Sequence, residues 1–181
     1  VDTITGGANT EVIAIDNNGG ATFTIASTDD IAAKAATIEK VVAAGASNQI
    51  ISITVHDGVF EDGIETIDLS ADTDATANNI IDVSNDDTNT NNWTLTGSAG
   101  IDTITGDSGA DIITGGAGND IITGGAGADI ILGGDGDDTF KYVATADLVN
   151  LNALVDTITG GANTEVIAID NNDGATFTIS S

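Results

Sequence analysis

Large apolar side chains recur every nine residues between positions 97 and 141. An aspartate stands two residues before each of them, and glycine dominates the first four positions of every nonapeptide. Glycine permits the positive φ angles of a tight turn, and the apolar residue that follows the aspartate predicts a short strand facing a core. The five nonapeptides read GSAGIDTIT, GDSGADIIT, GGAGNDIIT, GGAGADIIL and GGDGDDTFK.

This period predicts a parallel β-roll in which two nonapeptides form one coil. Alternate repeats then stack about 4.8 Å apart, the spacing of neighbouring strands. The aspartates form two columns, one with Asp102, Asp120 and Asp138, the other with Asp111 and Asp129. The apolar residues of the same repeats fill the interior: Ile104, Ile113, Ile122, Ile131 and Phe140.

Apolar and polar residues also alternate upstream of the nonapeptides, which predicts short strands at 50–55, 64–69, 79–83 and 93–96. Their spacing suits an irregular β-solenoid that leads directly into the β-roll. One stretch, Ser27 to Gly45, has helical periodicity, with a capping residue at its start and a glycine at its end. The fold class is therefore mainly β with one short α-helix, whose buried stripe would be Ile31, Ala35, Ile38 and Val42.

A second, longer repeat surrounds the first. Residues 1–27 recur at 155–181 with 25 of 27 positions identical, and only Gly19 and Ala26 change, to Asp173 and Ser180. The chain is thus expected to be slightly more than one period of a tandem array with a 154-residue unit. The predicted organisation is the start of a unit at 1–27, a helix and short-strand module at 28–96, the β-roll at 97–141, a connection at 142–154, and the start of the next unit at 155–181.

Counting in nines beyond residue 141 places Asp147, Asp156 and Glu165 at the acidic position. The glycines of the turn are missing between 142 and 159, so the register of the carboxylates continues further than the turn chemistry does. The metal columns could extend if Asp147 and Asp156 join them.

The amino-acid composition limits the classes of molecule that the chain is expected to bind. The chain has 29 acidic residues against three lysines and no arginine, for a net charge of -26, which excludes nucleic acid and anionic lipid as partners. Cysteine is absent, so oxygen ligands must supply any stabilising metal site. No stretch is apolar enough for membrane insertion, and Val1 in the first position indicates a segment of a longer protein.

Calcium is the cation that fits this pattern. Two carboxylates about 5 Å apart repel by about 3 kcal/mol at an effective dielectric constant near 20. A hard cation with six or more oxygen ligands bridges carboxylates of adjacent turns together with backbone carbonyl groups, whereas magnesium prefers a compact octahedron and retains its waters. About three calcium ions would lie between Asp102 and Asp120, Asp120 and Asp138, and Asp111 and Asp129.

The segment GGAGNDIITGGAGADIILGGDGDDTF resembles the RTX (repeats-in-toxin) family of secreted calcium-binding proteins. The resemblance implies a calcium-loaded parallel β-roll, type I secretion, and folding outside a bacterial cell. Ser98 and Asp107 replace the second glycine of the first two repeats, which predicts weaker binding there. The resemblance carries the ligand role onto the five aspartates, onto Asp156, and onto loop positions Gly109, Gly115, Ala117, Gly118, Gly124, Ala126, Gly127, Gly133 and Gly136.

Other polar groups have simpler interpretations. Asp57, Glu61 and Asp62 could form a further ion site, although acidic turns between strands are usually solvated. His56 is the only histidine, and without cysteine or a second histidine it predicts no zinc site. No nucleophile has a matched base partner, so we expect no enzymatic activity and no catalytic residue.

Three functions remain to be weighed. The faithful 27-residue copies favour a calcium-stiffened structural repeat unit of an extracellular fibre, surface layer or adhesin, with neighbouring units as partners. The alternative is the secretion and folding module of a secreted enzyme or toxin. A sugar-binding or ice-binding surface is less favoured, because the loop position that would carry a threonine row holds Ala99, Ser108, Ala117, Ala126 and Asp135.

Overall fold

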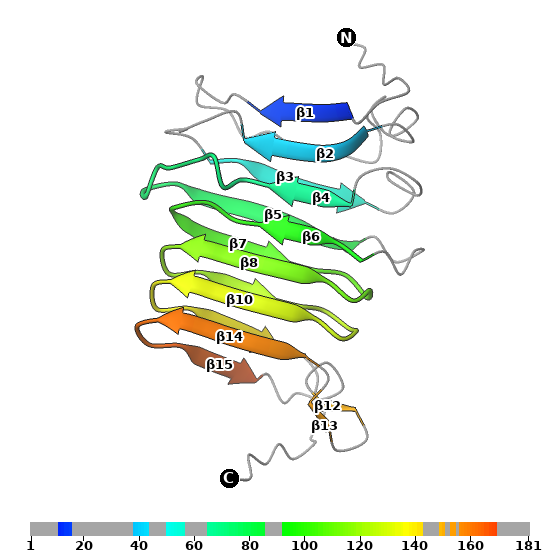
Figure 1. Cartoon of the computed structure of the whole chain (residues 1–181), viewed down its shortest axis with the longest axis vertical. Coiled ribbons are helices and arrows are strands. Elements are labelled where there is room, and N and C mark those ends of the chain that lie inside the picture. The colour runs from blue at the N-terminus through cyan, green and yellow to red at the C-terminus, as the bar shows by residue number, and fades with distance from the viewer. Residues whose placement is uncertain are drawn as a thin grey trace.

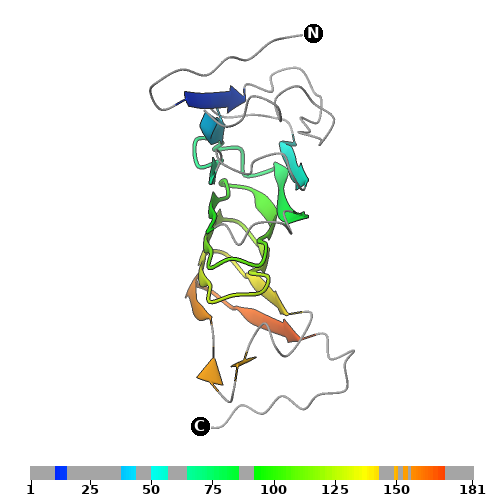
Figure 2. The same cartoon turned by 90° about the vertical axis from the view of Figure 1, so that its right-hand side faces the viewer.

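The computed structural model is a two-sided stack of parallel strands, elongated from one terminus to the other (Figure 1). It describes residues 11–15, 38–43, 50–56, 65–85, 92–142, 149–150, 153–154 and 156–169. The chain alternates between two facing sheets from β2 onward, so each pair of strands completes one coil (Figure 2). This architecture confirms the predicted β-roll and β-solenoid.

The seven-stranded sheet has the order β1-β2-β4-β6-β8-β10-β14, and the six-stranded sheet has the order β15-β11-β9-β7-β5-β3. All pairings within them are parallel. The strands of the first sheet are β1 (Glu11–Ile15), β2 (Ile38–Ala43), β4 (Thr66–Asp68), β6 (Thr94–Thr96), β8 (Ile112–Ala117), β10 (Ile130–Asp135) and β14 (Thr157–Ala162). Those of the second are β3 (Ser52–His56), β5 (Asn78–Asn85), β7 (Ile101–Thr105), β9 (Ile121–Thr123), β11 (Thr139–Tyr142) and β15 (Val166–Ile169).

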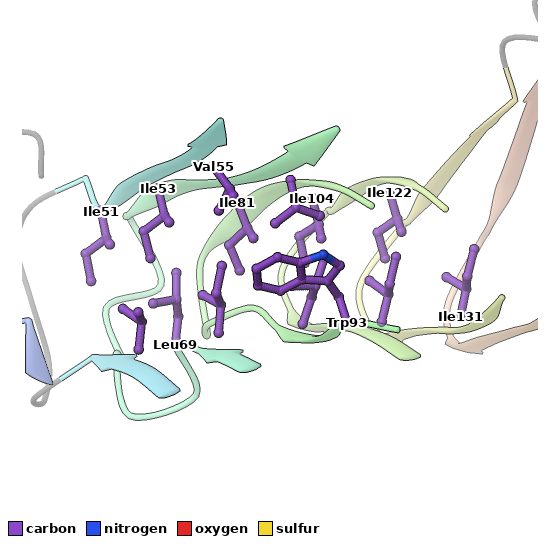
Figure 3. Close-up of a cluster of buried hydrophobic side chains, with 14 of the residues drawn as sticks. Ile51, Ile53, Val55, Leu69, Ile81, Trp93, Ile104, Ile122 and Ile131 are labelled. Atoms are coloured by element: carbon purple, nitrogen blue, oxygen red, sulfur yellow. The ribbon is translucent and has the colours of Figure 1, made fainter. Parts of the chain in front are cut away.

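The core is a narrow row of side chains between the two sheets (Figure 3). The nonapeptides contribute one apolar residue per strand, and Ile104, Ile113 and Ile122 are fully buried. The residues directly before and after each of them in the strand point outward, because successive side chains of a strand alternate between its two faces. Upstream, each strand contributes more to the same cluster, which includes Ile51, Ile53, Val55, Ile67, Leu69, Ile81, Val83, Trp93 and Leu95.

The four short strands predicted upstream of the nonapeptides are confirmed as β3, β4, β5 and β6. Their register joins them to the repeats without a break, since Leu95 of β6 pairs with Ile113 of β8 and Ile81 of β5 pairs with Ile104 of β7. The solenoid and the β-roll therefore share one core.

The predicted helix is wrong where the structure describes it. Residues 38–43 form strand β2, and the remaining positions of the predicted helix lie outside the described residues. Val41 and Ala43 are buried while Lys40 and Val42 are half-buried, which is the alternation of a strand. Parallel pairing with both β1 and β4 supplies backbone partners that outweigh the local helical preference.

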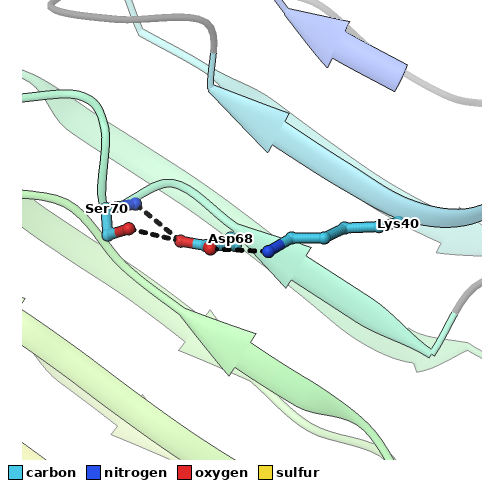
Figure 4. Close-up of polar contacts among 3 residues, drawn as sticks. All are labelled: Lys40, Asp68 and Ser70. Carbon is cyan, nitrogen blue, oxygen red and sulfur yellow. Dashed lines mark hydrogen bonds and ion pairs between the residues drawn. The ribbon is translucent and has the colours of Figure 1, made fainter. Parts of the chain in front are cut away.

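An ion pair on the outer surface reinforces β2 in its place. The Lys40 Nζ lies 2.8 Å from the Asp68 Oδ2 of β4, and the Ser70 backbone and hydroxyl groups donate to Asp68 Oδ1 (Figure 4). Burial alone would raise the pKa of Asp68, but these hydrogen bonds outweigh it and lower the pKa. A helix at 38–43 would lose this contact.

The sequence separation of stacked strands changes again after the nonapeptides. Stacked positions within the nonapeptides are 18 residues apart, whereas β14 pairs with β10 at a separation of 27 residues. The intervening chain includes a small antiparallel pair, β12 (Val149–Asn150) and β13 (Ala153–Leu154). One nonapeptide length is therefore left out of the stack before the coil continues at β14.

The inward and outward isoleucines of β9 give a direct test of the core. We expect Ile122→Ala to lower the free energy of unfolding by about 2–5 kcal/mol, because its side chain is fully buried and its loss leaves a cavity. Ile121→Ala removes the same atoms from a residue that is 39% exposed and should cost clearly less. Denaturant unfolding in saturating calcium measures both, and equal losses would contradict the assigned faces of β9.

Candidate metal centre

The aspartates of the nonapeptides form two columns, one along each edge of the roll. On the first edge the backbone N–H of Asp102 donates to Asp120 Oδ1 at 2.9 Å, and that of Asp120 donates to Asp138 Oδ1 at 3.0 Å. On the second edge Asp111 donates to Asp129 Oδ1 at 2.9 Å. All five carboxylates are buried. One oxygen of each stacked aspartate is thus committed to the neighbouring coil.

In the three downstream turns, the second carboxylate oxygen of the column aspartate has no hydrogen-bond donor. The Oδ2 atoms of Asp120, Asp129 and Asp138 are buried and accept no hydrogen bond. A buried charged oxygen without a partner is strongly unfavourable in the folded state. These atoms require a proton or a cation.

The first glycine of each Gly-Gly turn leaves room for the carboxylate of that turn and, at Gly115 and Gly133, for a carbonyl oxygen of the next coil. A Cβ placed on Gly115 would overlap Asp120 Oδ2 and lie 2.6 Å from the carbonyl oxygen of Gly133, one coil further on. A Cβ on Gly133 would likewise overlap Asp138 Oδ2 and lie 2.8 Å from Gly160 O. Carboxylate and carbonyl oxygens from successive coils therefore converge, and these are the ligands that calcium prefers.

The turns themselves fall into two kinds. In turns 115–120, 124–129 and 133–138 the glycines at positions two and four have positive φ, as Gly116 (123°) and Gly118 (110°) illustrate. In turns 97–102 and 106–111 neither of these positions has positive φ, because Ser98 and Asp107 replace glycine at position two. The two upstream turns have a different backbone conformation from the Gly-Gly turns.

The upstream turns also supply their own hydrogen-bond donors. Asp102 Oδ2 accepts the Ser98 N–H at 2.5 Å and the Ser98 hydroxyl at 3.0 Å. Asp111 Oδ2 accepts the Asp107 N–H at 3.1 Å. These carboxylates have hydrogen-bond donors that the carboxylates of the Gly-Gly turns lack, and weaker calcium binding at the first two repeats stays a prediction.

The structure places the predicted carbonyl ligands in two groups. The carbonyl oxygens of Gly115, Gly124 and Gly133 lie against the first glycine of the preceding turn on the same edge, beside the aspartate column. Those of Gly109 and Gly118 lie against the fourth-position glycines Gly127 and Gly136 of the following turn. For Ala117 and Ala126 the structure shows only that their N–H groups donate to the carbonyl groups of Ser98 and Asp107.

Asp156 continues the second column. Its Oδ1 accepts the Asp129 N–H at 2.9 Å, so it occupies the place that a strict count of 18 residues would give to Asp147. Asp147 lies outside the described residues, as do Asp57, Glu61 and Asp62. On the first edge, Glu165 follows Asp138, since the Val166 N–H donates to Asp138 O in the parallel ladder.

Two residues that sequence reasoning missed end the columns upstream. Asn79 pairs with Asp102, and its Oδ1 accepts the Ile51 N–H at 2.8 Å, as an aspartate would. Its Nδ2 donates to the buried Asp72 Oδ2 at 3.1 Å. The side-chain amide thus satisfies a carboxylate without a cation.

Trp93 ends the second column. Its backbone N–H donates to Asp111 Oδ1 at 2.8 Å, while its side chain is fully buried in the core. Counting back nine residues from Asp102 reaches Trp93, so the period could have found it. Asn79 is 23 residues from Asp102, and no count in nines leads to it.

Asp107 is a further acidic group on the second edge, beside Asp111, Asp129 and Asp156. It is buried, its Oδ1 accepts the Gly109 N–H at 2.7 Å, and its charge helps to raise the pKa values of Asp111 and Asp129. Burial raises the pKa of Asp107 itself. A residue treated from sequence only as a missing glycine therefore adds negative charge beside the column.

Burial raises the pKa of all five nonapeptide aspartates. It lifts the pKa of Asp102 and Asp111 to about 6 and that of Asp120 and Asp129 to about 7, while hydrogen bonds from backbone N–H groups partly oppose it. Repulsion from Asp102 and Asp138 adds to the shift at Asp120. Without metal, these carboxyl groups therefore bind protons at a higher pH than exposed aspartates do.

Within the described residues no group of three histidine, cysteine, aspartate or glutamate side chains gathers around one point. The available oxygens come instead from one carboxylate per turn and from the turn backbone. This donor set suits calcium, which accepts carbonyl ligands, and does not suit zinc.

Residues 94–122 and 105–140 match the family model of the RTX calcium-binding nonapeptide repeat (4 copies). These repeats bind calcium, so this part of the chain is calcium-binding. No curated protein and no solved structure matches the chain. None of the described residues forms a helix of the length and hydropathy that a membrane crossing requires.

The two kinds of turn lead to a prediction for paired variants. Asp120→Asn should raise the calcium concentration at half-saturation by about tenfold or more, because even residues outside the ligand shell change metal affinity by that factor. Asp102→Asn should have a smaller effect, since Ser98 already satisfies that carboxylate. Calcium titrations followed by circular dichroism measure both. Equal shifts would contradict the distinction between the turns.

The raised pKa values predict opposite responses to pH with and without calcium. Metal-free folded protein binds more protons than the unfolded chain between about pH 4 and pH 7, so its stability should fall as pH rises through this range. Calcium requires deprotonated carboxylates, so the stabilisation that it provides should grow over the same range. Denaturation midpoints in chelator and in calcium test this, and parallel pH profiles would contradict it.

Proposed function

We propose that the chain is a calcium-binding structural repeat unit of a secreted bacterial assembly, such as a fibre, surface layer or adhesin stalk. Neighbouring units are its partners, and it has no catalytic role. The observation that carries this proposal is the near-identity of residues 1–27 and 155–181, with 25 of 27 positions shared. In an assembly that grows by adding units, every junction between units is the same, so the sequences that form it must stay alike.

The architecture supports this role. In a solenoid each coil contacts mainly its neighbours, so length increases with the number of units and the cross-section stays constant. The two copies contribute β1 and β15, which are the first strand of one sheet and the last strand of the other. The repeated sequence therefore stands at the two ends of the stack, where units would meet.

Calcium would control the rigidity of such an assembly. The chain carries a net charge of -26, and the Gly-Gly turns leave buried carboxylate oxygens without partners. Extracellular calcium would remove both penalties after export, whereas a chain kept from calcium would lack a stable roll. The proposed secretion rests on this coupling and on the RTX repeats.

Electron microscopy of the native material provides the test. We expect a periodic filament or sheet in calcium that loosens when a chelator removes the ion and recovers when calcium is restored. Magnesium at the same concentration serves as the control, because it fits an irregular cage of carbonyl oxygens poorly. Material that keeps its order in chelator would refute the proposal.

The second candidate is a secretion and folding module of a secreted enzyme or toxin. The nonapeptide match favours it as strongly as it favours a structural unit, because the match covers only residues 94–140. The full-length reading frame separates the two candidates. A catalytic domain there would favour the module, whereas further copies of the unit would favour the structural assembly.

A further inference from the structure

The repeated pentapeptide EVIAI occurs in two different surroundings. At 11–15 it forms β1, the first strand of the seven-stranded sheet, and pairs with β2. At 165–169 it supplies β15, the last strand of the six-stranded sheet, which pairs with β11. The copy in β15 therefore shows the strand that precedes EVIAI in the stack, β11, and the copy in β1 shows the strand that follows it, β2.

The two pairings use the same register. Ile13 pairs with Val41, and its equivalent Ile167 pairs with Phe140. Val41 and Phe140 are both 1% exposed, so in each pairing the shared position lies opposite a core residue. A single strand can pair with β11 on one edge and β2 on the other only if both registers agree, because a shift of one residue would turn every side chain to the opposite face.

Among the residues that the structure describes, no strand pairs with the outer edge of β15. Ile167 occupies the core-facing position, yet it is 45% exposed, and the adjacent Val166 is 51% exposed. The equivalent residues Ile104, Ile113 and Ile122 have no exposure, because a further coil lies on each side of them. In the N-terminal copy, the strand that pairs with the same EVIAI sequence is β2.

We propose that a second copy of this unit continues the solenoid at β15, with the β2 strand of that copy pairing to the free edge of β15. This inference rests on the proposed function and adds the geometry of the junction. Since β15 belongs to the six-stranded sheet and β1 to the seven-stranded sheet, the six-stranded sheet of one unit becomes the seven-stranded sheet of the next.

The exchange of sheets fixes the relation between units. Six parallel steps separate β1 from β14, and β15 follows half a coil later. Successive units are thus related by about a half-turn around the solenoid axis and an advance of about 31 Å, at about 4.8 Å for each step. At each junction the two aspartate columns exchange edges, so each edge of an array carries the first column in one unit and the second column in the next.

Distances between spin labels on a two-copy chain test the junction. The chain is the present one extended after Ser181 by a second copy of residues 28–181, and it contains no natural cysteine. We expect labels at Lys141→Cys of the first copy and Val42→Cys of the second to lie two strands apart on one outer face. Their backbones should be about 10 Å apart, at about 4.8 Å for each strand.

The control pair keeps the second label and moves the first to Thr159→Cys, on the outer face of β14 in the other sheet. These labels point away from each other across the core and should give a clearly longer distance. A short distance for the control pair and a long one for the test pair would overturn the half-turn. Long distances for both pairs would overturn the continuous junction.

The junction and the proposed function can fail separately. Chelator-sensitive filaments with long distances for both pairs would keep the structural role and refute the continuous stack. A short test-pair distance together with native material that ignores the chelator would refute the calcium-dependent assembly and keep the junction. A third copy should lengthen the calcium-loaded particle by a further ~31 Å, about 4.8 Å for each strand, and no lengthening would contradict the stack.

Discussion

Each coil of the roll buries a carboxylate group against the coil before it, and the rest of the structure depends on how that charge is compensated. The backbone N–H of one aspartate holds one oxygen of the next, which fixes the register of the stack. The same contact brings like charges to the spacing of neighbouring strands, where they repel by about 3 kcal/mol per pair at an effective dielectric constant near 20. A cation bound between these carboxylates would replace the repulsion with attraction and would so stabilise the stack.

The demand for that cation increases along the chain. At the upstream end, Asn79 replaces a column aspartate and its amide satisfies Asp72, while Trp93 places a large apolar side chain in the core. Ser98 then provides donors for Asp102. From residue 115 onward the Gly-Gly turns leave one carboxylate oxygen of each aspartate without a partner.

In the Gly-Gly turns, two glycines are needed because oxygen atoms of the same turn and of neighbouring coils lie where their Cβ atoms would be. The first glycine leaves room beside the carboxylate, and the second adopts a positive φ while a carbonyl oxygen of the preceding coil lies against it, as at Gly134 and Gly116. A side chain at either place would occupy space that oxygen atoms need. In the turn at 160–165, Asn163 takes the fourth position with a φ of 83°, a conformation that asparagine tolerates better than most residues. The turn geometry thus continues after the run of glycines has ended.

The sequence by itself determined the nine-residue period, the two columns of aspartates, the core positions and the acidic oxygen ligands, because each follows from contacts that repeat at a fixed interval. It also predicted the upstream strands from their local alternation. Tertiary structure decided what depends on distant segments. Residues 38–43 became a strand because β1 and β4 offer backbone partners on both sides. Asp156 joined the column because a nonapeptide length is left out of the stack, and Asn79 ended the other column from 23 residues away. A local sequence pattern therefore predicts contacts that repeat at a constant interval. Where the length of chain between coils varies, only the tertiary structure shows which residue occupies the next position of a column.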